Sequence, residues 1–382
     1  MVPDGWKRQP LLKVAEVRSG VAKGKKDLKD PVEVPYLRVA NVQDGHLDLS
    51  EIKTIQIERS KLGRYALKYG DVLMTEGGDF DKLGRGDIWH EQISPCVHQN
   101  HVFAVRPDQT KIISYFLSAL TGSNYGKTYF LSCAKRSTNL ASINSTQLKE
   151  FPVLFPPLPE QIKIAQILST WDKAITTTEQ LLSNSQRQKK ALMQQLLTGK
   201  KRFPGFEGEW GEQILSDLVK ISYGKSPKDI FDKNGKYPVV GTGGVTGWSN
   251  NVMCDQASVI IGRKGTIDRP RYIEMPFWAI DTTFFCTPKK NCDIKWFSYL
   301  ISSVDLRRYN EASGVPSLSR GSIGSIKALV PPIAEQQKIA TALSAVDLEI
   351  ETSQQELEHL KQEKKALMQQ LLTGKRRVKI EG

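Results

Sequence analysis

The chain has 382 residues, enough for two or three domains, and 39% of them are hydrophobic, enough to fill real cores. Lysine and arginine outnumber aspartate and glutamate by 54 to 41, and the net charge of +13 favours an anionic partner, nucleic acid before membrane. No apolar run approaches the ~20 residues that span a bilayer, no signal peptide is recognisable, and five cysteines without a CxxC pair do not suggest a disulfide framework, so we expect a cytoplasmic protein.

Residues 1–155 are predicted to form the first of two compact α+β domains. Alternating stretches such as Gly70–Gly78 and Asn100–Pro107 predict short strands of a mixed, twisted sheet, and a short helix is expected at Lys111–Leu120. Basic residues interleaved with glycine and small polar residues suit contacts with DNA phosphates and base edges, although plain solvated loops have the same composition. The predicted DNA-binding residues here are Lys23, Lys25, Lys26, Lys82, Arg85, Arg136 and Asn139.

Residues 156–200 predict one long helix. Pro159 suits its first turn, Gly199 suits the position just past its end, and no proline or glycine lies between them. About forty residues at a rise of 1.5 Å give a length of about 60 Å, which favours a coiled coil. Apolar residues recur with the 3–4 spacing of a coiled-coil seam, and Lys189 falls in that seam. The predicted seam residues are Leu168, Trp171, Ile175, Leu182, Leu192 and Leu196.

Residues 201–330 predict a second α+β domain of the same kind. Strands are expected at Tyr237–Gly244 and Ala257–Gly265, and a helix at Ile294–Ser302. Basic, glycine-containing loops again predict contacts with DNA. The predicted DNA-binding residues of this domain are Lys225, Thr242, Arg263, Lys264, Arg269 and Arg320.

Residues 331–375 repeat the long helix and precede a basic tail, 376–382. The segment KKALMQQLLTGK occurs identically at Lys189–Lys200 and Lys364–Lys375, and a weaker match relates Trp6–Gly20 to Trp210–Gly224. The chain is therefore two copies of one plan, domain then helix. Matching lengths and registers predict that the helices pair as an antiparallel coiled coil with a pseudo-twofold relation, the alternative being that each packs on its own domain. The seam residues of the second helix are Leu343, Val346, Ile350, Leu357, Leu367 and Leu371.

No motif in the chain predicts catalysis. Gly224–Ser226 lacks the upstream glycine of a phosphate loop, and Gly241–Gly247 lacks the last glycine of a dinucleotide fingerprint. We predict no zinc site at Cys96, His98 and His101, because alternation along a strand would place the two histidines on opposite faces. We therefore predict no catalytic residue, no metal and no cofactor on this chain. A stand-alone DNA methyltransferase and a coiled-coil scaffold that binds only proteins are the alternatives.

The repeated pattern PPLPEQIKIAQIL…KKALMQQLLTGK and PPIAEQQKIATAL…KKALMQQLLTGK resembles the conserved regions of type I restriction–modification specificity subunits. Trp6–Gly20 and Trp210–Gly224 resemble the starts of that family's target recognition domains, so the resemblance covers nearly the whole chain.

The resemblance implies a non-catalytic DNA-recognition subunit. Each recognition domain would read one half of a bipartite, asymmetric DNA site, and the coiled coil would set the spacer between the halves. The helices would dock two modification subunits, which methylate adenine N6 with S-adenosylmethionine, and ATP-dependent restriction subunits could join them. The two identical dodecamers would then be equivalent docking surfaces.

Overall fold

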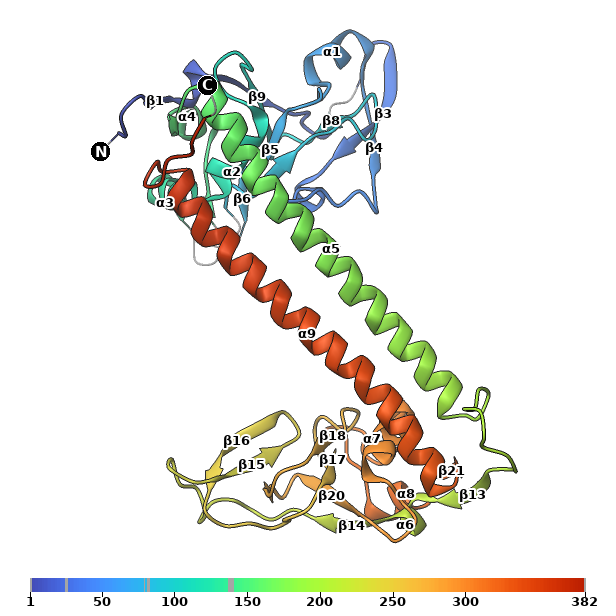
Figure 1. Cartoon of the computed structure of the whole chain (residues 1–382). Coiled ribbons are helices and arrows are strands. Elements are labelled where there is room, and N and C mark those ends of the chain that lie inside the picture. The colour runs from blue at the N-terminus through green and yellow to red at the C-terminus, as the bar shows by residue number, and fades with distance from the viewer. Residues whose placement is uncertain (1, 25–26, 79, 81–82, 137–140, 381–382) are drawn as a thin grey trace. The chain divides into compact units, whose positions relative to one another are not determined.

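The computed structural model describes residues 2–24, 27–78, 80, 83–136 and 141–380, with Arg136 described for its backbone alone. These residues form two compact units (Figure 1). The first unit comprises residues 1–178 and 356–382, and the second comprises residues 179–355. Each unit therefore combines one globular domain with a stretch of both long helices. Among the described residues, no helix has the length and apolar character needed to cross a membrane.

The first domain is built on a four-stranded antiparallel sheet and smaller sheets beside it. The four-stranded sheet has the order β2 (Ala15–Ser19), β9 (Val102–Pro107), β5 (Val72–Thr75) and β7 (Gly86–Ile88). A three-stranded mixed sheet has the order β4 (Lys53–Glu58), β3 (Pro31–Leu37) and β8 (Val97–His98), the last pair being parallel. The remaining strands are β1 (Lys7–Pro10) paired with β12 (Pro152–Phe155), and β10 (Lys135–Arg136), β11 (Ala141–Ser142) and β6 (Gly77–Gly78) in one small sheet.

The second domain repeats three of these sheets, and among its described residues the small sheet β10-β11-β6 has no counterpart. Its four-stranded sheet has the order β14 (Val219–Tyr223), β20 (Thr283–Pro288), β17 (Ser258–Gly262) and β18 (Arg271–Ile273). Its mixed sheet has the order β16 (Gly244–Ser249), β15 (Tyr237–Gly241) and β19 (Trp278–Ala279), again with one parallel pair, and β13 (Gly211–Ile214) pairs with β21 (Lys327–Val330). The predicted α+β class with mixed sheets is thus confirmed in both domains.

Short helices cover the sheets, and one of the predicted helices starts later than expected. The short helices are α1 (Leu62–Tyr65), α2 (Ser114–Gly122), α3 (Asn124–Cys133), α4 (Ser145–Lys149), α6 (Leu215–Leu218), α7 (Ile294–Ser303) and α8 (Arg320–Gly324), with 3-10 turns at Leu11–Lys13, Val39–Asn41, Arg59–Lys61 and Leu306–Tyr309. Helix α7 matches its prediction, whereas α2 begins three residues after Lys111. The cause is that the backbone before Ser114 is bonded elsewhere. The amide of Lys111 donates to the Asp108 carbonyl, and the Gln161 side chain donates to the Lys111 carbonyl and accepts from the amide of Ile113.

The long helices are α5 (Leu158–Leu196) and α9 (Ile333–Leu371), each of 39 residues. Gly199 and Gly374 follow their ends with φ angles of +70° and +67°, the left-handed conformation that glycine adopts without a Cβ penalty. Four of the predicted seam residues are buried and eight are half-buried. The buried ones are Leu168, Leu196, Leu343 and Leu371; the half-buried ones are Trp171, Ile175, Leu182, Leu192, Val346, Ile350, Leu357 and Leu367.

The helices pair in an antiparallel manner, and each seam lysine contributes an ion pair. In the first unit Lys364 of α9 pairs with Asp172 of α5. In the second unit Lys189 of α5 pairs with Asp347 of α9 at 2.5 Å. Each aspartate also accepts a hydrogen bond from a tyrosine of the adjacent domain, Tyr115 in one unit and Tyr299 in the other. Burial raises the pKa of Tyr299, so its hydroxyl stays protonated as the donor.

The C-terminal end of each long helix lies in the core of a domain. Leu371 and Leu372 of the first unit pack among residues such as Phe116 and Phe151. Leu196 and Leu197 of the second unit pack into the core around Trp296. The repeated dodecamer therefore contributes the same apolar residues to two equivalent cores.

A buried glutamate near the start of each long helix forms an ion pair with an arginine that lies just after the end of the other long helix. The Arg377 guanidinium donates to both carboxylate oxygens of Glu160, at 2.7 and 2.8 Å. The Arg202 guanidinium donates to those of Glu335, at 2.9 and 2.7 Å, where the indole of Trp210 is a third donor. Arg377, placed by sequence in a basic tail, is thus the repeat equivalent of Arg202 and takes part in the fold of the first unit.

Candidate nucleic-acid interface

Four segments of the second domain converge where three strands of its four-stranded sheet, β14, β17 and β20, begin or end. We call this site loop junction 2; its segments are Tyr223–Lys225, Arg263–Lys264, Ala279–Thr282 and Ser317–Arg320. Tyr223 is 46% exposed, and the guanidinium carbons of Arg263 and Arg320 lie 5.4 and 5.7 Å from the centroid of its ring. Neither guanidinium has a carboxylate partner among the described residues, so two unneutralised cations share one aromatic ring.

Backbone hydrogen bonds hold loop junction 2 together. The amide of Arg263 donates to the Thr282 carbonyl, and the Arg263 carbonyl accepts from the amide of Leu318, both at 2.9 Å. The amide of Lys225 donates to the Ala279 carbonyl, also at 2.9 Å. A Cβ on Gly224 would lie 2.0 Å from the Ile280 carbonyl oxygen, so only glycine permits this close approach.

Five of the six residues predicted to bind DNA in this domain lie at or beside loop junction 2. Arg263, Lys264, Arg320 and Lys225 belong to its segments. Thr242 lies at the turn of the β15–β16 hairpin, whose Gly241 packs against Ile280.

Arg269, the sixth, lines a cavity of about 470 Å³ with Arg307 and Asp268, which form an ion pair at 2.5 Å. Gly265 and Pro316 also line this cavity, next to the segments of loop junction 2.

The first domain has an equivalent site with the same backbone hydrogen bonds. We call it loop junction 1; its segments are Ser19–Val21, Glu76–Gly77, His98–His101 and Ser142–Ile143. The amide of Glu76 donates to the His101 carbonyl at 3.0 Å, and the Glu76 carbonyl accepts from the amide of Ile143 at 2.8 Å. The amide of Val21 donates to the His98 carbonyl at 2.7 Å. Glu76 therefore occupies the position that Arg263 occupies in the second domain.

The DNA-binding residues predicted in the first domain are less fully described. Lys25, Lys26, Lys82 and Asn139 lie outside the described residues, and of Arg136 only the backbone, in β10, is placed. The Lys23 ammonium lies 5.4 Å from the centroid of the Tyr36 ring. Arg85 accepts a backbone hydrogen bond from the amide of Thr75, which precedes Glu76. Lys23 therefore lies two residues after the Ser19–Val21 segment of loop junction 1 in sequence, and Arg85 contacts the residue that precedes its Glu76–Gly77 segment.

Sequence reasoning missed three side chains of these junctions: Tyr223, Glu76 and His101. The His101 imidazole and the Glu76 carboxylate lie 2.5 Å apart, from Nδ1 to Oε2, and both are partly exposed. The sequence offered no signal for Tyr223, because Trp6–Gly20 and Trp210–Gly224 differ at most of their positions, Ser19 and Tyr223 being one such pair. The tertiary contacts of its ring with Arg263 and Arg320 indicate its role instead.

Nearby histidine and cysteine side chains are structural. His98 is 1% exposed, its Nδ1 lies 2.6 Å from the Val102 carbonyl oxygen, and burial lowers its pKa to about 4. Burial likewise raises the pKa of the Cys96 thiol to about 12. Among the residues that the structure places, no three histidine, cysteine, aspartate or glutamate side chains are grouped to hold a metal ion.

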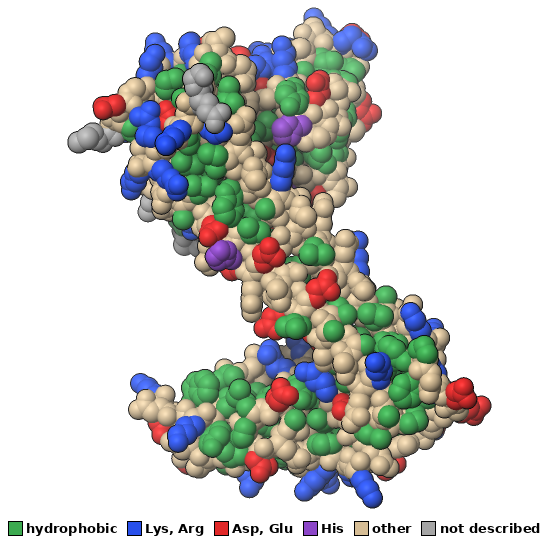
Figure 2. All heavy atoms as spheres, viewed as in Figure 1, with side chains coloured by type: hydrophobic (Ala, Val, Ile, Leu, Met, Phe, Trp, Pro, Cys, Tyr) green, Lys and Arg blue, Asp and Glu red, His purple; other side chains and the backbone are tan. Residues whose placement is uncertain are grey.

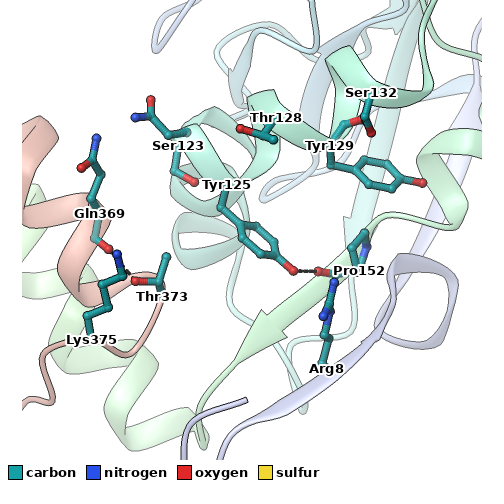
Figure 3. Close-up of a pocket in the computed structure, with 11 residues that line it drawn as sticks. Arg8, Ser123, Tyr125, Thr128, Tyr129, Ser132, Pro152, Gln369, Thr373 and Lys375 are labelled. Carbon is teal, nitrogen blue, oxygen red and sulfur yellow. Dashed lines mark hydrogen bonds between the residues drawn. The ribbon is translucent and has the colours of Figure 1, made fainter. Parts of the chain in front are cut away.

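A second candidate surface lies at the end of α9 (Figure 3). There a cavity of about 490 Å³ is lined by α3 residues, by Arg8 of β1, and by Gln369, Thr373 and Lys375 of the repeated dodecamer. The Tyr125 hydroxyl points across it and donates to the Pro152 carbonyl at 2.6 Å. At the position of α3 the second domain, as the structure describes it, has only the 3-10 turn Leu306–Tyr309, so the two dodecamers have different neighbours.

Lysine and arginine side chains are spread over the visible face of both globular parts, interspersed with hydrophobic and acidic ones (Figure 2). The net charge of +13 is therefore not confined to one domain.

Comparisons with known proteins agree with this layout. A family model described as the type I restriction modification DNA specificity domain matches residues 3–184 and again residues 207–362. The chain is 28% identical to a putative type I restriction enzyme MjaX specificity subunit of Methanocaldococcus jannaschii, over 99% of this chain and 95% of that protein. It is 23% identical to the type I restriction enzyme EcoprrI specificity subunit of Escherichia coli, over 88% and 86%. The crystal structure of a type I restriction-modification S subunit from M. genitalium has the same fold, with a TM-score of 0.64 at 17% identity over 96% of each chain.

Proposed function

The chain belongs to the family of type I restriction–modification DNA specificity subunits, and we propose that its two domains, residues 1–155 and 201–330, each bind one half of a bipartite, asymmetric DNA site. As a specificity subunit it is the DNA-recognition component of its complex and not the catalytic one.

One observation carries the assignment of two different half-sites. Loop junctions 1 and 2 have matching backbone hydrogen bonds but different side chains, Glu76 and His101 in one, Arg263, Arg320 and Tyr223 in the other. A constant backbone that presents variable side chains is suited to reading two unrelated sequences with one fold. The predicted DNA-binding residues beside these side chains would supply contacts with the phosphates.

The paired helices set the spacer in this proposal, and the two dodecamers dock two modification subunits. The inward residues of each dodecamer pack into a domain core, which explains their identity without a partner. The exposed residues of the dodecamers do not pack into a core, yet they are identical as well. They are Lys190, Ala191, Gln194, Gln195 and Lys200, repeated as Lys365, Ala366, Gln369, Gln370 and Lys375. Equivalent docking of two identical subunits accounts for this second identity.

S-adenosylmethionine would bind to the modification subunits, and restriction subunits could join the same complex. A cytoplasmic location suits this assembly and the five free cysteines.

Mapping of methylated adenines across the genome of the host tests the division of labour. We expect one bipartite, asymmetric consensus that disappears when this chain is deleted. The purified chain alone should transfer no methyl group from S-adenosylmethionine, and the complex with its modification subunits should bind duplex DNA with an affinity that falls as salt rises. Methyl transfer by the chain alone would indicate an enzyme, and salt-independent or absent DNA binding by the complex would indicate a protein scaffold.

Native mass spectrometry of the assembled complex tests the docking surfaces. Ala191→Glu should remove one modification subunit, Ala366→Glu the other, and the double variant both, because each introduces a charge into one exposed dodecamer face. Gln180→Glu, at an exposed helix position outside the dodecamers, is the control. Retention of two modification subunits by the double variant would contradict the assignment.

A further inference from the structure

Arg263 in loop junction 2 and Glu76 in loop junction 1 occupy equivalent positions of the repeated fold. We propose that this is a base-reading position, that Arg263 and Arg320 read guanine in the second half-site, and that Glu76 reads cytosine in the first; the inference rests on the proposed function.

The equivalence of the two positions follows from their bonds. Each residue donates its amide to the segment before the central strand of the four-stranded sheet, through Thr282 or His101. Each accepts from the segment that leads into the next short helix, through Leu318 or Ile143. Each follows directly after the strand that pairs with that central strand, since β17 ends at Gly262 and β5 ends at Thr75. The backbone is therefore fixed alike in both domains, and only the side chain distinguishes them.

The chemistry of loop junction 2 selects acceptors. A guanidinium carries donors and no acceptor, and guanine presents two acceptors, O6 and N7, in the major groove. Arg263 is held over Tyr223 and donates from Nη1 to the Asp281 carbonyl at 3.2 Å, which restricts its side chain. Arg320 approaches the same ring from another segment. The restricted guanidinium of Arg263, with that of Arg320 beside the same ring, suits a base edge. Phosphate contact requires no such restriction, and the exposed Lys264 suits that task.

The chemistry of loop junction 1 selects a donor. Glu76 accepts from His101 at Oε2, and no other described residue donates to its Oε1. A partly exposed carboxylate at a DNA surface is repelled by phosphates, so a hydrogen-bond donor on the DNA that reaches Oε1 would favour its placement there. The cytosine N4 amino group is the donor that a carboxylate accepts from in the major groove.

Methylation of a DNA library with randomised half-sites by the assembled complex, read by sequencing, tests the assignment. For Arg263→Ala or Arg320→Ala, discrimination against bases other than guanine should fall about 5- to 100-fold at a single position of one half-site. Glu76→Gln should relax a single cytosine position of the other half-site and shift it towards adenine, because the Gln amide pairs with adenine N6 and N7. Both half-sites must otherwise keep their consensus.

Two matched variants separate base contacts from other effects. Lys264→Ala should weaken binding to all sequences alike and reduce the slope of binding against salt by about one. Lys338→Ala removes an exposed lysine that also lies against an aromatic ring, Phe203, 5.9 Å from its centroid, but belongs to neither junction, and should change nothing.

Tyr223 is a positioning residue in this proposal. Tyr223→Phe keeps the ring and should retain guanine selectivity, whereas Tyr223→Leu should relax the same position as Arg263→Ala. Uniform weakening by Arg263→Ala, or relaxation of one half-site by both the Arg263 and Glu76 variants, would overturn the inference. If the wild-type complex shows no bipartite consensus at all, the proposed function itself fails.

Discussion

Several polar side chains are buried in the two domains, and most have a specific partner. The Asp71 carboxylate, 1% exposed, accepts from both Nε and Nη2 of Arg106 at 2.7 Å and from the amide of Lys68 at 2.8 Å. Glu160 and Glu335 each accept an arginine through both oxygens. A buried charge without such partners would destabilise the fold by several kcal/mol. Each unit can therefore fold only in a way that brings these carboxylates and arginines together.

His98 makes the stability of the first unit depend on pH. Its pKa is about 4 in the folded state and about 6.5 in the unfolded state, so the unfolded state binds more protons between these values. This contribution is complete above pH 6.5 and is lost as the pH falls towards 4, by about 3 kcal/mol. His98→Asn, which keeps a donor for the Val102 carbonyl but does not titrate, should reduce the slope of unfolding free energy against pH.

Urea unfolding of the first unit, followed by hydrogen exchange between pH 7 and pH 4.5, measures this slope. His359→Asn is the control, because His359 is an exposed residue of α9 paired with Glu363. An unchanged slope in the His98 variant would show that other groups cause the acid sensitivity.

Gly199 and Gly374 are identical in sequence context but should not tolerate alanine equally. Both have left-handed φ angles, which cost an alanine about 1–2 kcal/mol. A Cβ on Gly199 would meet Trp210 at an ordinary 3.6 Å, whereas a Cβ on Gly374 would lie 2.5 Å from Cγ of Pro3. Gly374→Ala should therefore destabilise its unit more than Gly199→Ala does, as measured by hydrogen exchange at each helix end. Equal losses would mean that Pro3 moves aside at no cost.

At the scale of the element, charges specify how α5 and α9 pair. The antiparallel register places Lys364 with Asp172 in one unit and Lys189 with Asp347 in the other. A parallel, in-register pairing would instead place the repeat-equivalent Lys189 and Lys364 together, so like charges would meet. The seam thus favours one orientation by attraction and disfavours the other by repulsion.

A double-mutant cycle on Asp172 and Lys364 should reveal this attraction. Lys364→Glu alone should destabilise the first unit because two acids then meet, and Asp172→Lys with Lys364→Glu should recover part of the loss. We expect a coupling free energy of about 0.5–1 kcal/mol in chemical unfolding, since both side chains remain partly exposed. The same cycle on Asp347 and Lys189 should give a similar value, and additive effects in both cycles would exclude the seam pairs as determinants of orientation.

At the scale of the whole molecule, neither unit is a continuous segment of chain. The first unit needs residues 356–382 to complete its core, and the second needs residues from both long helices. Because such contacts join residues far apart in sequence, the first domain cannot finish folding before α9 is available. Recognition domains and helices therefore form one cooperative arrangement within each unit.

A heptad inserted into each long helix should lengthen the preferred DNA spacer. Seven residues after Gln180 and seven after Gln355 preserve the seam and add about 10 Å, or about three base pairs. Methylation of DNA with graded spacers should then shift to longer spacers, while both half-site sequences stay the same. An insertion in α5 alone is the control, and it should destabilise the complex because the seam loses its register. A spacer that does not move would show that the helices do not set it.

The sequence by itself determined the repeat, the helices and the family, because these depend on periodic and local patterns. Pro159, Gly199 and the 3–4 spacing of apolar residues act within one helix, so they are readable without a fold. The tertiary structure alone decided which residues meet. It paired Asp172 with Lys364 and Arg377 with Glu160, and it brought Arg263 and Arg320 to the Tyr223 ring. These partners are far apart in sequence, and only the closure of the loops determines their proximity, so no local pattern could have indicated them.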